Sequence, residues 1–456
     1  MSRLIHHNLY IYYSLVLVLF IVNVFLKNEA LEYIVGLLAL PMLFISYLGA
    51  AKLFRILGTV FVLIGLVLFL YAGLPLYEIP FYMTSTMPLL AFLAVLPWMN
   101  SVVRAGRFDR RINQLMKSNV EDLGKLYVRT SLTTYTLVSF INLSALSLTQ
   151  NVLIENMTKF KKTLRDAFIS RTTLRAFAIA LAWSPMEIMV AITVDTTGVS
   201  YLTYLPWLLL CSVIILVIDT LWGKKAFQNV PYEPAVEGHN RVFSPKEFGL
   251  QILHLLVVLT TFLAIVVFVG NQFNLNFILT VTLVILPFAC IWALFMKKWR
   301  SFLAIGWGTW KARTNGMQNF VVLFLSLAFF SSSLNETPFL QLIQEPFLAA
   351  SGYPIIILLL IQFMYLGMSM IGVHPVATVG VLMEVLPPLY DVMNPLSIGM
   401  VLITGALATA TVGTYGVTVT MTSMNTIENP YRIMLRNMPF ALLYGGIGTL
   451  IAYLLL

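Results

Sequence analysis

Glu187 is the strongest candidate for chemistry in this sequence, because it lies in the middle of the apolar run 176–198, directly after Ser184 and Pro185. A proline removes a backbone donor and breaks the hydrogen-bond ladder of a helix. Carbonyl groups freed at such a break can, together with a carboxylate, bind a cation or a proton inside a membrane. We therefore predict that Ser184 and Glu187 belong to a substrate or ion site. The alternative is a glutamate that hydrogen-bonds to a neighbouring helix for packing alone.

A second break is predicted in residues 367–388, where Gly372, His374 and Pro375 interrupt an apolar segment. An unwound backbone at this point would expose carbonyl groups, and a histidine titrates in a range suited to proton coupling. His374 and the following Thr378 are therefore candidates for the substrate or ion site. The alternative for His374 is an uncharged interior histidine with its hydrogen bonds satisfied.

Glycine and threonine recur together in residues 404–429, which read TGALATATVGTYGVTVTMTSMNTIEN. We interpret this segment as two half-helices that meet at a tip, where backbone amides and hydroxyls could bind an anionic or polar group. The binding candidates are Thr411, Thr414, Thr418 and Asn425. In the alternative interpretation the hydroxyls bond back to their own helices, and the small residues only allow helices to pack closely.

A re-entrant hairpin is predicted between Arg129 and Lys159, because this largely uncharged stretch lies between two strongly basic segments. Short basic loops stay on the cytoplasmic side of a membrane, so both flanks should face the same compartment. Irregular backbone within the bilayer is tolerated only where protein or a water-filled cavity surrounds it. The polar residues that could line such a cavity are Asn142, Ser144 and Ser147.

The composition is that of a membrane protein: of 456 residues, 59% are hydrophobic and 10% are charged, and the mean hydropathy is +0.88. Apolar runs of about 20 residues are long enough to cross a bilayer. We therefore predict an all-α polytopic membrane protein of about 10–12 transmembrane segments, with re-entrant hairpins and broken helices. The basic residues gather in loops beside the apolar runs, which argues against nucleic acid as a partner. The same loops place the protein in the cytoplasmic (inner) membrane with its N-terminus in the cytoplasm.

The order of these features divides the sequence into four regions. We predict N-terminal transmembrane helices in 1–103, a first repeat with an arm helix and a hairpin in 104–222, a cytoplasmic linker in 223–247, and a second repeat with an arm helix and broken helices in 248–456. A shift of 184 residues aligns six identical residues of the two halves. This similarity leaves open whether the halves are a true duplication and whether it is inverted.

Two basic amphipathic stretches, Arg104 to Val128 and Phe160 to Arg175, are expected to lie along the inner membrane surface. Asp195 and Asp219 fall near the ends of apolar runs, where we expect solvated carboxylates. The sequence contains no Walker loop, dinucleotide fingerprint, HExxH or paired-cysteine motif. We therefore expect no catalytic or metal-binding residue, no enzyme activity and no cofactor, and Na⁺ or H⁺ as the coupling ion.

The order of surface arm helices, re-entrant hairpins and broken helices with Ser, Thr, Asn and Pro at the break resembles the ion transporter superfamily. This superfamily includes divalent-anion/sodium symporters, arsenite permeases and the large permease subunit of tripartite periplasmic transporters. The resemblance covers Arg104 to Trp222 and Trp299 to Leu456. It implies an elevator-like carrier whose hairpin tips lie at the substrate. The Ser-Asn-Thr hairpin signature of the dicarboxylate symporters does not appear as such.

The expected function is therefore ion-coupled secondary active transport of a small polar or anionic solute across the cytoplasmic membrane. Two alternatives stay open. One is a lipid or lipid-linked carrier (flippase), and the other is a membrane-embedded transferase that uses His374 with Glu384 or Asp391 as acid and base. The expected partners are a small-molecule or lipid substrate and membrane lipids, and formation of a homodimer is left open.

Overall fold

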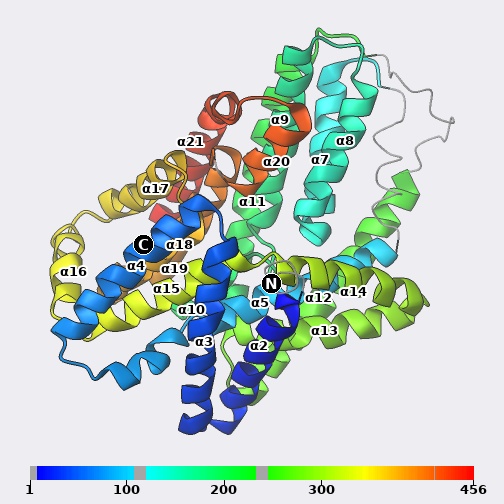
Figure 1. The fold of residues 1–456 in the computed structure, drawn as a ribbon. Coiled ribbons are helices and arrows are strands. Elements are labelled where there is room, and N and C mark those ends of the chain that lie inside the picture. Colours follow the sequence, from blue (N-terminus) through cyan, green and yellow to red (C-terminus); the bar gives the residue numbers. More distant parts are fainter. Residues whose placement is uncertain (1–7, 107–119, 233–244, 415) are drawn as a thin grey trace. The chain divides into compact units, whose positions relative to one another are not determined.

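The computed structural model describes residues 8–106, 120–232, 245–414 and 416–456, and Figure 1 shows their helices. Regular structure in this part of the chain is helical, apart from one isolated β-bridge between Asp122 and Pro231. Eight of its helical segments are long and apolar enough to cross a membrane. The prediction of an all-α polytopic membrane fold is confirmed.

The long apolar segments are α2 (Leu9–Leu26), α3 (Glu29–Gly49), α4 (Lys52–Tyr71), η1 (Leu76–Met83) with α5 (Met87–Ala105), α11 (Tyr201–Phe227), α13 (Phe277–Phe295), α15 (Gln318–Asn335) and α21 (Pro430–Leu454). Shorter apolar stretches form α10 (Ile188–Thr197), part of α12 (Pro245–Phe273), α17 (Pro354–Met370), α18 (Pro375–Val385) and α19 (Pro395–Ala408). The remaining helices are α7 (Leu123–Ile141), α8 (Leu143–Asn156), α9 (Lys162–Leu181), α14 (Trp299–Asn315), α16 (Phe339–Ala349), η2 (Pro387–Asp391), η3 (Thr409–Thr411) and α20 (Val417–Thr426).

Local sequence signals explain where many of these helices begin. The side chains of Asn28, Ser200, Asn394 and Asn429 each accept a hydrogen bond from a backbone N–H in the first turn of α3, α11, α19 and α21. A side chain in this position satisfies a donor that has no partner within the helix. Prolines also occupy the first turn of α17, α19 and α21, where the missing N–H costs nothing.

Apolar side chains face outward on the long helices. On α2, Leu15, Val18 and Phe25 are each more than half exposed. Apolar surface of this extent is rare on soluble proteins and suits a lipid environment.

The chain folds into two compact units. The first contains residues Met1–Val102, Ile278–Ala350 and Val379–Leu389. Its central helix is α15, which packs against α3, α4 and η1. Within this unit the Glu384 side chain accepts a hydrogen bond from the Ser331 hydroxyl.

The second unit contains residues Val103–Phe277, Ser351–Thr378 and Tyr390–Leu456. Helix α9 is largely buried in this unit, with contacts to α7, α8, α11, α20 and α21. The four regions predicted from the sequence are not tested by this division and stay a prediction. Residues 107–119, the centre of the first expected surface stretch, lie outside the described residues.

The prediction of a surface helix over Phe160 to Arg175 is wrong, because α9 carries most of this stretch into the core of the second unit. Arg175 is 3% exposed, and its Nη1 donates to Asp219 Oδ1 at 2.9 Å. Asp219 is completely buried, so the expected solvated carboxylate is also wrong at this position. It accepts a second bond from the Tyr127 hydroxyl at 2.9 Å, while Arg175 Nε donates to Asn437 Oδ1 at 3.0 Å. Burial is possible because each charge has a partner from another helix.

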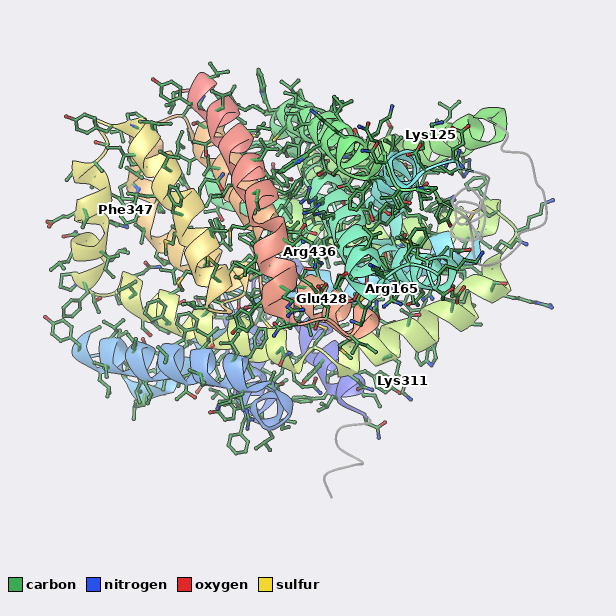
Figure 2. The ribbon with its side chains drawn as sticks, turned by 90° about the horizontal axis from the view of Figure 1, so that it is seen from above. Lys125, Arg165, Lys311, Phe347, Glu428 and Arg436 are labelled. Atoms are coloured by element: carbon green, nitrogen blue, oxygen red, sulfur yellow. The ribbon has the colours of Figure 1, made fainter. Side chains whose placement is uncertain are left out.

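A second ion pair lies on α21 and the loop before it. Figure 2 shows Glu428 and Arg436 side by side, and Arg436 Nη2 donates to Glu428 Oε1 at 2.6 Å. Arg436 Nη1 reaches Glu428 Oε2 at 2.9 Å and also donates to the Ser170 hydroxyl of α9 at 3.0 Å. These bonds attach the first turns of α21 to α9.

Candidate functional site

A helical hairpin, α7 followed by α8, lies where the basic flanks predict one. A single residue, Asn142, joins the two helices, which lie side by side in Figure 1. Its backbone angles are φ 45° and ψ −130°. A non-glycine residue in such a conformation costs of order 1–3 kcal/mol, and strain of this kind is found at ligand-binding sites. The hairpin tip is therefore a candidate for function on backbone evidence as well as on residue type.

A broken helix follows the hairpin. Helix α9 ends at Leu181 and α10 begins at Ile188, with Pro185 in the interval. Ser184 is buried, and its hydroxyl accepts a hydrogen bond from the Met186 N–H at 3.4 Å. The predicted break at this position is confirmed.

The hairpin tip and this break meet at Glu187, which is 9% exposed. The Asn142 side chain and the backbone N–H groups of Ile188 and Met189 are the polar groups that face its carboxyl group. No side-chain hydrogen bond of normal geometry caps α10, so these contacts are looser than those of an ordinary helix cap. No cation forms an ion pair with Glu187 within the described residues. The carboxyl group is thus surrounded by neutral donors.

Hydrogen bonds hold the hairpin against the broken helix beside this point. Trp183 Nε1 donates to the Tyr135 hydroxyl oxygen at 2.7 Å, and the Tyr135 and Ser212 hydroxyls are 3.0 Å apart. Ser212 donates to the Ile179 carbonyl at 3.1 Å. The chain of bonds therefore connects α7, α9 and α11, and sequence reasoning did not identify it.

The Gly/Thr-rich segment forms the second break. Helix α19 ends at Ala408, η3 follows, and α20 begins at Val417, as predicted for two half-helices. Helix α9 packs against η3, so the two broken helices are neighbours within the second unit. The Thr411 hydroxyl donates to the Ala408 carbonyl at 2.9 Å and the Thr418 hydroxyl to the Ala410 carbonyl. Both hydroxyls therefore donate to carbonyl groups of their own segment, as the alternative interpretation expects.

Thr414 behaves differently, because its hydroxyl donates to the Met370 carbonyl at the end of α17, at 3.3 Å. This bond attaches the second break to the turn that carries His374. Gly372 has φ +97° in that turn, a conformation that glycine adopts without strain. His374 Nδ1 accepts the Val376 N–H at 3.2 Å. Thr378 is 1% exposed, and no hydrogen bond to its hydroxyl is formed in the described part of the chain.

Of the remaining predicted residues, Asn425 belongs to a second polar cluster, centred on Gln150. Ser144 and Ser147 are half-buried on α8, the helix that carries Gln150. Asn425 Nδ2 donates to Gln150 Oε1 at 2.8 Å. Gln150 was not among the predicted residues, although an uncharged amide inside an apolar segment beside Thr149 is a signal that could have identified it.

Gln150 joins three helices. It is completely buried, and its Nε2 donates to the hydroxyl oxygens of Thr173 on α9 at 3.0 Å and of Thr422 on α20 at 2.8 Å. With the bond from Asn425, both hydrogens and the oxygen of its amide are used. The hairpin helix α8 is therefore connected to both broken helices.

Two oxygen-bearing groups at the first break could hold a monovalent cation or a proton, namely the Glu187 carboxyl group and the Asn142 side-chain carbonyl. The described part of the chain contains no candidate transition-metal site, because no three His, Cys, Asp or Glu side chains gather there closely enough to hold a metal ion.

Comparison with known proteins shows the fold. No protein-family model and no curated protein sequence matches the chain. The structure is similar to the crystal structure of the YdaH transporter from Alcanivorax borkumensis, with a TM-score of 0.57 and 13% sequence identity. The similarity covers 87% of this chain and 98% of that one. At this level of identity the likeness is one of fold, and it covers nearly the whole length of both chains.

Proposed function

We propose that this protein is an ion-coupled secondary active transporter, and that its site lies where the Asn142 hairpin tip meets the helix break at Ser184 to Glu187. The structural similarity to the YdaH transporter supports membrane transport as the class of function. The coupling ion is Na⁺ or H⁺, and the solute is small and polar or anionic.

The observation that carries this proposal is the buried carboxyl group of Glu187 without a cationic partner in the described structure. A lone carboxylate in a low-dielectric interior is costly, so it must bind a proton or another cation. An exchangeable cation at a helix break is the device by which a carrier couples solute movement to an ion gradient.

The first break supplies a carboxyl group, whereas the second break supplies neutral hydrogen-bond donors and acceptors. Backbone N–H groups at the start of α20 and the hydroxyls of Thr411, Thr414 and Thr418 can donate to or accept from a polar solute. Their proximity to α9 through η3 is why we assign solute and ion to one site. Because Gln150 connects α8, α9 and α20, the hairpin and both breaks would move as one body, in the elevator-like manner implied by the family resemblance.

The proposal is tested first by ion binding, which needs no knowledge of the solute. The melting temperature of the purified protein is measured in NaCl and in choline chloride, and across a pH series. A ligand that binds only the native state at 100 times its Kd stabilises it by about 2.7 kcal/mol. We expect the wild type to respond to sodium or to pH, and Glu187→Gln to lose that response while it still folds.

Asp195→Asn is the matched control, because Asp195 lies at the end of α10 and accepts a hydrogen bond from the Phe277 N–H. It should keep the wild-type ion response. Metabolites that raise the melting temperature are then used for uptake and export in proteoliposomes, where Glu187→Gln should abolish gradient-driven flux. An unchanged ion response in Glu187→Gln removes Glu187 from the mechanism, and a wild type that responds to neither ion rejects ion coupling.

A further inference from the structure

The helices of the first unit have a common end at which the charged side chains of the described residues are all positive. The Ala51 N–H, just before α4, donates to Asn319 Oδ1 near the start of α15 at 2.8 Å. The Tyr10 N–H, at the start of α2, donates at 2.8 Å to Oδ1 of Asn315, the last residue of α14. Helices α2, α4 and α15 therefore begin at the same end, and α14 connects α13 to α15 there. The Lys and Arg residues of this end are Lys52, Arg55, Lys297, Lys298, Arg300, Lys311 and Arg313.

The carboxylates of this unit lie at the opposite end. The ring of Tyr71, the last residue of α4, is 5.1 Å from that of Phe339, the first residue of α16. The described Asp and Glu residues around this opposite end are Glu29, Glu32, Glu78, Glu336, Glu345 and Glu384. Between residues 248 and 335 the sequence contains no Asp or Glu. None of the cations at the α14 end forms an ion pair within the described part of the chain, so no described residue neutralises them.

Aromatic contacts fix α14 on its inner side. Trp98 of α5 lies 5.5 Å from the ring of Phe302 and 6.2 Å from that of Trp310. A Cβ atom at Gly306 would come within 2.5 Å of the Trp98 ring, so glycine allows the two helices to approach. The ring of Tyr10 on α2 packs edge-on against Trp310, with centroids 5.6 Å apart. The inner side of α14 is therefore occupied by α2 and α5.

The outer side of α14 combines apolar side chains with cations. Trp299, Leu303 and Trp307 follow one another at intervals of four residues and are 37%, 39% and 55% exposed. Residues at this spacing share one face of a helix. Arg300, one turn before Leu303, is also exposed. Tryptophan beside basic residues is typical of helices that lie in the headgroup region of a bilayer.

The ends of the neighbouring helices place α14 at the level of the headgroups. Helices α2, α4, α13 and α15 are long and apolar enough to cross the hydrocarbon core, whereas α14 is not one of the candidate spans. Its outer face therefore meets phosphate groups and the upper parts of acyl chains. Anionic phospholipids complement a surface that has cations and no carboxylates, and zwitterionic phospholipids carry as much positive as negative charge.

We propose that the outer face of α14 is a docking surface for anionic phospholipids. Arg300 and the neighbouring Lys297 and Lys298 hold the phosphate groups, while Trp299 and Trp307 enter the boundary between headgroups and acyl chains. Such contacts would fix the first unit to one leaflet of the membrane. The surface is separate from the proposed ion site at Glu187.

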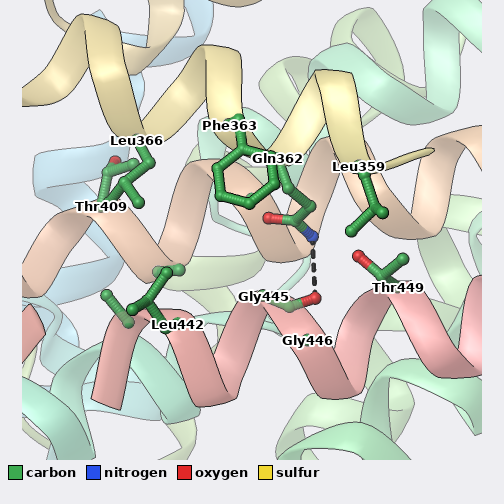
Figure 3. Close-up of a pocket in the computed structure, with 12 residues that line it drawn as sticks. Leu359, Gln362, Phe363, Leu366, Thr409, Leu442, Gly445, Gly446 and Thr449 are labelled. Carbon is green, nitrogen blue, oxygen red and sulfur yellow. Dashed lines mark hydrogen bonds between the residues drawn. The ribbon is translucent and has the colours of Figure 1, made fainter. Parts of the chain in front are cut away.

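The second unit offers an uncharged surface for comparison. Figure 3 shows a groove between α17, α19 and α21, where Phe363 and Leu442 are 58% and 49% exposed. Its polar side chain Gln362 donates to the Gly445 carbonyl at 3.1 Å. No Lys or Arg lines this groove. Lipid that lies against it should therefore show no preference for an anionic headgroup.

The test places the photoreactive amino acid p-benzoylphenylalanine at Leu303 in the full-length protein. The protein is reconstituted in nanodiscs that contain equal amounts of palmitoyl-oleoyl phosphatidylglycerol, which is anionic, and palmitoyl-oleoyl phosphatidylcholine, which is zwitterionic. Both lipids have the same acyl chains, so the ratio of their adducts in mass spectrometry reports headgroup preference alone. We expect the phosphatidylglycerol adduct to dominate by about 5-fold or more, the contribution of one Lys or Arg near an anionic surface. The same amino acid at Leu442 should give equal amounts of both adducts.

Charge variants show whether the cations cause the preference. Lys298→Gln combined with Arg300→Gln should reduce the preference at Leu303 toward equality. Lys224→Gln combined with Lys225→Gln is the matched control, because it removes the same charge from exposed positions in the last turn of α11 and should leave the preference unchanged. Both double variants change exposed side chains only, so their melting temperatures in detergent should equal that of the wild type. Raising the salt concentration from about 0.1 M to about 1 M shortens the Debye length from about 10 Å to about 3 Å and should also lower the preference.

Three outcomes overturn the proposal. Equal adducts at Leu303 and Leu442 would mean that α14 does not select anionic lipid. A preference that survives Lys298→Gln with Arg300→Gln would mean that these cations are not its cause. Crosslinks from Leu303 to protein in place of lipid would mean that another polypeptide segment covers this face. None of these results depends on ion coupling, so the site at Glu187 would stand or fall separately.

Discussion

Replacing Gln150 by leucine removes the amide that joins α8, α9 and α20. The expected loss of stability follows from the hydrogen bonds that this amide makes. Gln150 makes three hydrogen bonds, to Thr173, Thr422 and Asn425, between 2.8 and 3.0 Å. Each contributes about 0.5–1.5 kcal/mol, which gives about 1.5–4.5 kcal/mol in total. The two hydroxyls still donate to their own helices, Thr173 to Ile169 and Thr422 to Thr418. Neither hydroxyl is left without an acceptor for its hydrogen, so we expect the free energy of unfolding to fall by about 2–3 kcal/mol.

The assay is reversible unfolding in mixed micelles with increasing SDS, followed by tryptophan fluorescence and far-UV circular dichroism. Asn425→Ala removes one of the three bonds and should cost about 1 kcal/mol. Because the two residues interact directly, the double variant should be less destabilised than the sum of the single variants by about 1 kcal/mol. Gln228→Leu is the control, since Gln228 is exposed at the end of α11 and should change stability by less than about 0.5 kcal/mol. Additive effects of Gln150→Leu and Asn425→Ala, or a cost of Gln150→Leu no larger than that of the control, would refute this reasoning.

Two further predictions concern charge and topology. Asp219→Asn leaves Arg175 buried without a counter-charge and should destabilise the protein by about 3–5 kcal/mol in the same unfolding assay. Glu121→Gln, in the exposed pair with Lys125, should change the stability far less. Similar costs for the two variants would contradict the structure. Single cysteines at the exposed positions Asn151 and Lys162, in a background without Cys211 and Cys290, should not react with an impermeant thiol reagent outside intact cells but should react after permeabilisation. Labelling from outside at either position would mean that the chain crosses the membrane there.

The helices that were predicted well are those specified by local sequence. The predicted apolar run Leu9 to Leu26 coincides with α2, and the run from Phe277 to Met296 differs from α13 by one residue. The breaks at Pro185 and in the Gly/Thr-rich segment were also predicted, because proline and glycine act on the backbone at their own positions. Hydrophobic length and helix breakers are properties that a single sequence displays directly.

The segment Phe160 to Arg175 shows where local patterns mislead. Its charges and apolar residues resemble a surface helix, yet most of α9 is buried within its unit. The charge of Arg175 is neutralised by Asp219, 44 residues later, and its Nε is bonded to Asn437, 262 residues later. A pattern in one segment cannot reveal partners at such distances.

The candidate site also combines features that the local sequence indicates with contacts that only the tertiary structure sets. Residue type and spacing identified Glu187 and Asn142, because a carboxylate beside a helix break and a polar hairpin tip are local signals. Their meeting, and the lack of a cation beside Glu187 within the described residues, follow from how α7, α8 and α9 pack. The same holds for the hydrogen bond between Gln150 and Thr422. Apolar length and backbone breaks are set by neighbouring residues along the chain, whereas hydrogen-bond partners of buried polar groups are set by whichever helix packs beside them.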